Sequence, residues 1–265
     1  MELKIHHATE YAYSAPVDYA LQKVRLMPLS SPVQAVQEWS IELSGGKVEA
    51  SYVDHYGNHV DLVSLEPGAE VLRISAHGTV TTLDGSGVFG AHAGRAPLWH
   101  FVQPTLMTQA GDAIKALPRI MGDREHRVRD LHDLSAAILK ALPYQLGGTT
   151  VDTPAETALQ GNHGVCQDHA QIFVSAARLS GLPARYVSGY LMINDQIDQE
   201  ASHAWAEAYV EGLGWVGFDV SNGVSPDEKY VRIAVGRDAR DAAPIEGLRM
   251  GMADETLMVS LQVQQ

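Results

Sequence analysis

The sequence predicts an α+β protein whose first third is rich in β-strands, whose middle is helical and whose last third returns to strands. Three patterns support this order. Alternating apolar and polar residues recur before residue 95, apolar residues recur at spacings of three and four within 128–142, and alternating runs resume after residue 184. We therefore expect a β-rich module at 1–95, a core at 96–235 and, at 236–265, an extended segment with a strand that packs on the β-rich module.

The N-terminal module is expected to be an antiparallel, sandwich-like unit. Short strands at regular spacing, separated by turns rich in glycine, proline and asparagine, are typical of sandwiches and barrels. Such turns occur at Gly45-Gly46, Gly57-Asn58 and Pro67-Gly68. The expected strands are 21–27, 36–43, 47–53, 60–65 and 71–80.

The core is expected to contain two helices followed by three strands. Apolar residues line one face of 128–142, and Pro143 ends this helix. The second helix covers 166–180 and is ended by Gly181 and Pro183. Three strands follow at 184–191, 204–210 and 215–220, with Gly212-Leu213-Gly214 as the hairpin turn between the last two.

The C-terminal segment ends in another expected strand. Leu257, Val259, Leu261 and Val263 alternate with mostly polar residues and share one face. The stretch before this strand, 236–251, is expected to be an extended connection. We expect the final strand to return to the β-rich module, which would make the two units structurally inseparable.

Composition excludes several classes of protein. The chain has 265 residues, a formal net charge of −13 and one cysteine. The acidic balance argues against nucleic acid or an anionic membrane as partner, because both are bound through basic patches. A single cysteine excludes an internal disulfide, a zinc-finger cage and an iron–sulfur cluster. No apolar run approaches the roughly 20 residues that span a bilayer, and no secretory signal is visible. We expect a soluble, cytoplasmic protein.

The only thiol, Cys166, lies where a glycine-containing loop meets the expected start of the second core helix. Unpaired N–H groups and the helix dipole stabilise a thiolate at such a position. Gly164 leaves room for a substrate backbone, and the N–H of Cys166 could donate to an oxyanion. The alternative is that Cys166 is a small buried apolar residue, as free cysteines often are.

Two later segments supply a base and a carboxylate. His203 opens one expected strand and Asp219 lies near the end of the next. If the hairpin pairs odd residues with odd ones, both side chains point to the same side of the sheet. A cysteine on a helix start, a histidine on a strand and an aspartate that orients the histidine form a catalytic triad. We therefore predict Cys166, His203 and Asp219 as catalytic residues, with no cofactor and no metal ion.

Three segments around these residues resemble the signatures of the transglutaminase-like superfamily: 164–168 (GVCQD), 202–207 (SHAWAE) and 214–219 (GWVGFD). The stretch 6–14, the turn 54–58 and the late segment 236–238 resemble bacterial members that carry a β-rich N-terminal region. The resemblance implies a papain-like core, in which the helix with the nucleophile packs on an antiparallel sheet. It implies that Cys166 is the nucleophile, His203 the general base and acid, and Asp219 the carboxylate that orients His203.

This resemblance implies thiol-dependent acyl transfer on peptide bonds or glutamine amides of a peptide or protein substrate. We expect a cysteine peptidase-like hydrolase, because the chain has no clear counterpart of the tryptophan that lines the oxyanion site of animal transglutaminases. A protein-glutamine transamidase or deamidase is the first alternative. The second is a non-catalytic module that binds peptides on the same scaffold.

Other polar residues carry weaker signals. Gln160 lies six residues before Cys166, the spacing of the oxyanion-hole glutamine in papain-type proteases, but a single glutamine in a polar loop is weak support. His163 and His169 flank Cys166, and a metal site there is disfavoured because no second ligand cluster exists. Structural or surface roles are favoured for His55, His59, Trp205, Trp215, Tyr186, Tyr190, Asp168 and Glu207.

Overall fold

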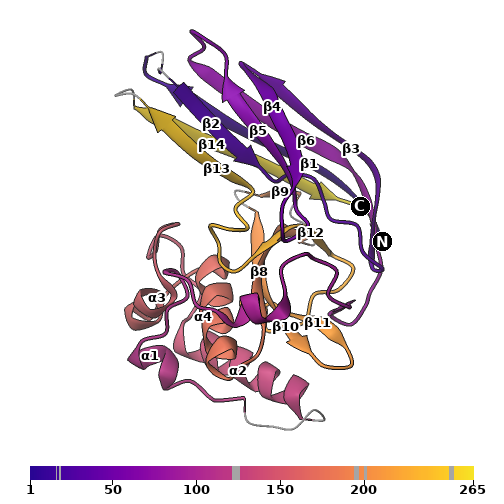
Figure 1. The fold of residues 1–265 in the computed structure, drawn as a ribbon, viewed down its shortest axis with the longest axis vertical. Coiled ribbons are helices and arrows are strands. Elements are labelled where there is room, and N and C mark those ends of the chain that lie inside the picture. The colour runs from indigo at the N-terminus through magenta and orange to yellow at the C-terminus, as the bar shows by residue number, and fades with distance from the viewer. Residues whose placement is uncertain (16, 18, 121–125, 194–196, 200–201, 251–253) are drawn as a thin grey trace.

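Long strands form one part of the molecule, and helices with a sheet of shorter strands form the other (Figure 1). This computed structural model describes residues 1–265 except 16, 18, 121–125, 194–196, 200–201 and 251–253. Within the described residues, no helix is long and apolar enough to cross a membrane.

Two antiparallel sheets stack in the first part. One sheet has the strand order β3-β6-β1-β14-β9, and the other has the order β13-β2-β5-β4. Alternate side chains of their strands meet between the sheets, including Leu3, Ile74 and Leu261. The strands are β1 (Glu2–Tyr13), β2 (Tyr19–Val24), β3 (Gln34–Ser44), β4 (Gly46–Val53), β5 (His59–Leu65), β6 (Val71–Thr82), β9 (Asp198–Gln199), β13 (Ile245–Met250) and β14 (Glu255–Gln264).

The five expected N-terminal strands appear as β2 to β6 with shifted ends, and β1, β9 and β13 appear in these sheets where no strand was expected. β1 is the centre of its sheet and pairs with β6 on one side and β14 on the other. Its apolar alternation is weak because the polar residues His7 and Thr9 are among its buried positions. The extended connection expected at 236–251 is wrong in its second half, since β13 pairs with β2. β13 is an edge strand with mostly exposed residues, so it has no apolar alternation.

The second part is a five-stranded antiparallel sheet with helices against it, in the order β12-β8-β10-β11-β7. Helix α4 packs on β8 and β10, and α2 packs on α4. Phe173 of α4 stacks on Phe218 of β11 with 5.0 Å between ring centres. The elements are β7 (Val88–Gly90), the 3-10 helix η1 (Leu98–Val102), α1 (Asp112–Lys115), α2 (Arg127–Ala141), α3 (Ala155–Gly161), α4 (Cys166–Leu179), β8 (Ala184–Leu191), β10 (His203–Val210), β11 (Gly214–Phe218) and β12 (Tyr230–Gly236).

The two expected helices correspond to α2 and α4 within one residue at each end. Helix α3 was not expected, and it changes the setting of Gln160. That residue lies on α3, not in a loop, and its amide donates to Glu156 at 2.9 Å. Gln160 is exposed and does not line the cleft that contains Cys166, so an oxyanion role for it is not supported.

The two parts share contacts that hold them together. Tyr190, Val231 and Ile233 of the second part are buried in the same apolar cluster as the strands of the sandwich. In the turn between β4 and β5, the Asn58 side chain exchanges two hydrogen bonds of 2.8 Å with the backbone of Val235. The unit boundaries at residues 95 and 235 stay a prediction.

Candidate active site

Cys166 is the first residue of α4, and the loop before it is fixed from inside the protein. Val165 has extended backbone angles and precedes the helix. The carboxylate of Asp168 accepts the N–H of Val165 at 2.8 Å and the hydroxyl of Thr149 at 2.6 Å. At Gly164 a Cβ would lie 2.9 Å from an Asp168 oxygen, so a larger residue does not fit. These contacts set the direction in which the chain enters the helix and hence the position of the thiol.

Replacing Asp168 with alanine is expected to lower the free energy of unfolding by about 3 kcal/mol, because two donors would lose a charged acceptor. The thermal midpoint should fall by about 6–12 °C in differential scanning calorimetry. The matched variant Thr149→Val removes one of the two hydrogen bonds and should cost about 1 kcal/mol. Equal midpoints for the two variants would show that Asp168 does not hold this loop.

His203 is the first residue of β10, which pairs antiparallel with β11 in a hairpin. The register pairs Glu207 with Gly217 and Tyr209 with Trp215, so odd residues face odd ones, as expected. This register puts Asp219, just beyond the end of β11, on the same side as His203. Nε2 of His203 lies 2.7 Å from Oδ2 of Asp219, and Cys166 is close enough to help raise the pKa of the His203 ring. The structure therefore brings Cys166, His203 and Asp219 together at one site.

Asp219 is fully buried, and its charge is satisfied by several donors. Besides His203, Oδ2 accepts the Asn222 side-chain N–H at 2.6 Å and the Tyr230 hydroxyl at 2.8 Å. Burial raises the pKa of Asp219, but the hydrogen bonds and the charge of His203 outweigh it and hold that pKa below its ordinary value. Asp219 is therefore a carboxylate at neutral pH.

The charge state of His203 follows from its two neighbours. Burial lowers the pKa of His203, but hydrogen bonds to Asp219 and Cys166, together with the charges of both groups, raise it to about 10. Since Nε2 faces Asp219, Nδ1 is the ring nitrogen left for the sulfur. The arrangement therefore favours the imidazolium form of His203 at neutral pH.

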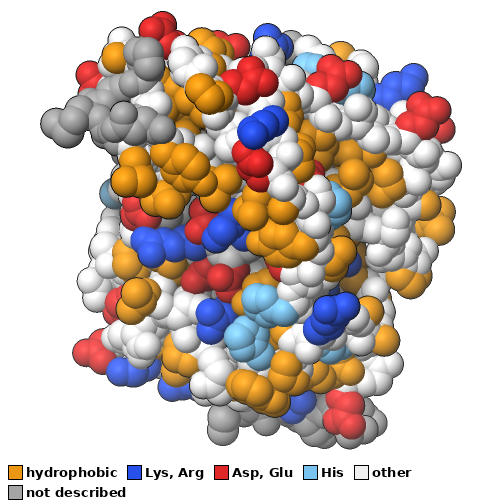
Figure 2. Space-filling view, turned by 45° about the horizontal axis from the view of Figure 1, so that its top comes forward, with side chains coloured by type: hydrophobic (Ala, Val, Ile, Leu, Met, Phe, Trp, Pro, Cys, Tyr) orange, Lys and Arg blue, Asp and Glu red, His pale blue; other side chains and the backbone are white. Residues whose placement is uncertain are grey.

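Cys166 and His203 both line a cleft of about 920 Å³. Val151 and Ser188 also line it on the side of the core, and Thr9 and Leu257 line it on the side of the sandwich. Cys166 is half-buried, and the backbone N–H of Cys166 has no acceptor among the described residues. On the face shown in Figure 2, acidic and basic side chains are interspersed with apolar ones and not gathered into a field of one sign.

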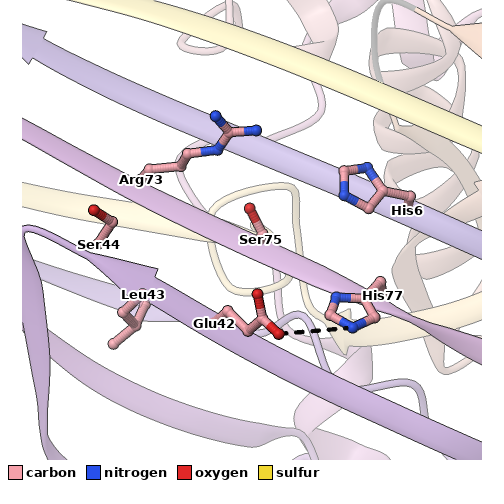
Figure 3. A pocket seen from close by; sticks show the side chains of 7 residues that line it. All are labelled: His6, Glu42, Leu43, Ser44, Arg73, Ser75 and His77. Carbon is pink, nitrogen blue, oxygen red and sulfur yellow. Dashed lines mark ion pairs between the residues drawn. The ribbon is translucent and has the colours of Figure 1, made fainter.

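A smaller hollow, of about 390 Å³, lies on the outer face of the β3-β6-β1 sheet (Figure 3). Its polar side chains include His6, His77 and Glu42, with 3.9 Å between His77 Nε2 and a Glu42 oxygen. Neither this group nor any other set of three His, Cys, Asp or Glu side chains in the described chain is arranged to hold a metal ion. None of the predicted site residues lines this hollow.

Several residues support the site without having been predicted for it. His169, the second histidine near Cys166, is buried, with Nε2 at 2.7 Å from the carbonyl of Leu142 and Nδ1 at 2.8 Å from the hydroxyl of Ser221. Burial lowers the pKa of His169, so it is a neutral link between α4 and the loop after Asp219. Asn222 and Tyr230 hold the carboxylate of Asp219. The turn sequence Ser221-Asn222-Gly223, which begins two residues after Asp219, was a signal that could have indicated Asn222.

Glu207, on the same strand as His203, has a structural role. It is fully buried between two arginines. Its Oε2 lies 2.5 Å from Nη2 of Arg185, and its Oε1 lies 3.2 Å from Nε of Arg232. The guanidinium of Arg185 lies 3.9 Å from the centre of the Trp215 ring. This cluster fixes three strands of the sheet that carries His203, and it does not reach the cleft.

Comparison with known proteins gives two family matches. Residues 115–220 match the model of the transglutaminase-like superfamily, and residues 3–81 match the model of the bacterial transglutaminase-like N-terminal region. The uncharacterized protein ML0607 of Mycobacterium leprae (strain TN) is 28% identical in an alignment that covers 98% of each chain. The uncharacterized protein Rv2569c of Mycobacterium tuberculosis is also 28% identical, over 92% of this chain and 86% of its own length.

One solved structure resembles the whole chain. The crystal structure of a candidate cysteine protease from Cytophaga hutchinsonii is 24% identical, with a TM-score of 0.75, and covers 100% of this chain and 91% of the other. At this identity the likeness shows a shared fold. It extends over the sandwich as well as the sheet that carries the site.

Proposed function

Because this chain belongs to the transglutaminase-like superfamily, we propose that it is a thiol-dependent amide hydrolase with Cys166 as nucleophile, His203 as proton carrier and Asp219 as the carboxylate that orients His203. One observation carries this proposal. His203 is held between the thiol and a buried carboxylate, and its pKa is raised to about 10, next to a solvent-accessible cleft. A ring in this state can keep a thiolate ionised and then donate a proton.

In the first half of the proposed reaction, the Cys166 sulfur attacks the carbonyl carbon of an amide. The N–H of Cys166 donates to the oxygen that becomes negative. His203 transfers the proton on Nδ1 to the departing nitrogen, the carbon–nitrogen bond breaks, and a thioester and a free amine result. Asp219 keeps the ring aligned through Nε2 during this transfer.

In the second half, water attacks the thioester carbon while neutral His203 accepts a proton from that water. The carbon–sulfur bond breaks, a carboxylic acid leaves, and the Cys166–His203 ion pair is restored. We propose water as the acceptor because no tryptophan is among the described residues that line the cleft. The features expected of a cross-linking enzyme are therefore incomplete at this site.

The proposal is tested by incubating the full chain with a peptide library and a dansyl amine, followed by mass spectrometry. We expect cleaved peptides with the wild type and none with Cys166→Ala. Amine incorporation or conversion of glutamine to glutamate without cleavage would instead make the protein a transamidase or a deamidase. Peptide binding with no product that depends on Cys166 would make it a non-catalytic binding module.

A further inference from the structure

Strand β8 forms part of the floor of the cleft that contains Cys166. Tyr186 and Ser188 of this strand line the cleft, and so does Ala204, which pairs with Ser188 across β8 and β10. Because side chains alternate along a strand, Tyr186 and Ser188 point to the same side of the sheet. This is the side of α4, since Cys166 packs against the apolar cluster that contains Tyr186 and Ala204. Two hydroxyl-bearing side chains and the nucleophile therefore lie on one side of the sheet.

Neither of these two hydroxyl groups has a hydrogen-bond partner within the part of the chain that the structure describes. Both side chains are well enclosed, since Tyr186 and Ser188 are each 4% exposed. The described side-chain atoms that are fully shielded and lack a partner include the hydroxyl of Tyr13 but neither of these two. The hydroxyls of Tyr186 and Ser188 therefore reach the open space of the cleft, where solvent or a bound molecule must satisfy them.

The next residue on the same side of β8, Tyr190, shows the contrast. Its hydroxyl lies 2.9 Å from Nδ1 of His7, and Nε2 of His7 lies 3.1 Å from the hydroxyl of Thr9. Burial lowers the pKa of His7 to about 4, so this ring is neutral at neutral pH. His7 and Thr9 line the cleft as well, but their polar atoms are satisfied within the protein. The row of polar groups along β8 is thus complete at Tyr190 and open at Tyr186 and Ser188.

The surroundings of Tyr186 decide which kind of group fits beside it. Burial raises the pKa of Tyr186 well above its ordinary value, and the acidic groups of Cys166, Asp168 and Asp238 raise it further. Tyr186 therefore stays protonated and can donate a hydrogen bond. A carboxylate of a bound molecule would meet charge of its own sign here. An ammonium group would lose most of its hydration and gain only neutral hydroxyls in return.

We propose that the hydroxyls of Tyr186 and Ser188 form a specificity subsite that binds an uncharged hydrogen-bonding side chain of the substrate, a carboxamide or a hydroxyl. This inference rests on the proposed function and specifies its substrate: a peptide with such a side chain close to the bond that Cys166 attacks. A carboxamide matches the subsite best, because its oxygen accepts from Tyr186 and its nitrogen donates to Ser188. An apolar side chain of the same shape would leave both hydroxyls without a partner.

The test compares peptide probes that differ in one side chain of nearly constant shape: asparagine, leucine or aspartate. The probes are acetyl-dipeptide chloromethyl ketones, which alkylate Cys166 and release chloride. In one series the varied residue is next to the ketone and alanine precedes it, and in the other series the order is reversed. Intact-mass spectrometry gives the second-order rate of alkylation. In one of the two series we expect wild type to react with asparagine at least about fivefold faster than with leucine and about tenfold faster than with aspartate.

Tyr186→Phe keeps the ring and removes one hydroxyl, so the asparagine and leucine probes should then react within about twofold of each other. Ser188→Ala should reduce the preference in the same direction. The matched control is Tyr209→Phe, because Tyr209 packs on Trp215 with 5.5 Å between ring centres and does not line the cleft. This control should keep the wild-type preference. Since the Tyr186 hydroxyl has no partner to lose, Tyr186→Phe should keep the thermal midpoint within about 2 °C of wild type.

A wild type without preference for asparagine in either series, or a preference that Tyr186→Phe leaves unchanged, would overturn the subsite. Iodoacetamide, which carries no peptide side chain, should label Cys166 equally fast in wild type and Tyr186→Phe. If Tyr186→Phe slowed iodoacetamide as much as the asparagine probe, the hydroxyl would act on the thiol and the subsite would again be wrong. Slow labelling by iodoacetamide that His203→Ala does not change would refute the proposed function, whatever the order of the probes.

Discussion

Replacing Cys166 with serine is expected to lower kcat/KM for a cleaved peptide by at least about 10³-fold, equivalent to about 4 kcal/mol of transition-state stabilisation. A serine hydroxyl fills nearly the same space, but the imidazole of His203 does not hold it ionised at neutral pH, as it is proposed to hold the thiolate. The dissociation constant of the uncleaved peptide should change less than about threefold, because the substitution leaves the walls of the cleft as they are. Steady-state kinetics and anisotropy measure the two effects separately.

Non-additivity is the control for this prediction. When residues act as one unit, the first substitution already removes nearly all of the rate enhancement that the unit provides. His203→Ala should therefore lower kcat/KM about as much as Cys166→Ala, and the double variant should be no worse than either single variant. If the losses add, or if His203→Ala stays within about threefold of the wild type, His203 does not act through Cys166 and the proposed mechanism is wrong.

The grouping of the site residues followed from local patterns in the sequence. Gly164 and Cys166 stand at the start of an amphipathic helix, and alternation along a hairpin with a short glycine turn puts His203 and Asp219 on one side of a sheet. Each of these patterns depends on neighbours within about 20 residues. The ends of α2 and α4 and the strands β8, β10 and β11 were predictable for the same reason, whereas β7 and β12 were not predicted. The catalytic assignment of the three residues stays a prediction until it is tested by substitution.

The walls of the cleft could not be predicted in this way, because they depend on contacts between distant residues. Leu257 and Val259 face the cleft because β14 crosses the molecule to pair with β1, which lies about 250 residues earlier in the chain. β13 is an edge strand whose apolar residues do not alternate regularly with polar ones, so nothing in its pattern distinguishes it from a loop. Tyr230 reaches Asp219 from a different strand, and no local spacing indicates that contact.

Asp219→Asn is expected to move the alkaline limb of the pH–rate profile to lower pH. In the wild type the pKa of His203 is raised to about 10, so the imidazolium, and with it the proposed ion pair, should persist until the pH approaches 10. Without the carboxylate only Cys166 still opposes the effect of burial, so the pKa of His203 should fall from about 10. At pH 7.5 a larger fraction of the rings should then be neutral, and we expect kcat/KM to fall by about 10²–10³-fold, with partial recovery toward pH 5.5.

The same substitution should change stability with a defined dependence on pH. A histidine whose pKa is raised by folding contributes stability that is complete below its unfolded value of about 6.5 and is lost as the pH rises through about 10. The thermal midpoints of wild type and Asp219→Asn should therefore differ more at pH 6 than at pH 10. Tyr230→Phe is the matched control, since it removes one hydrogen bond to Asp219 and leaves the charge. An alkaline limb that moves with Tyr230→Phe but not with Asp219→Asn would mean that packing around the carboxylate, and not its charge, sets the protonation of His203.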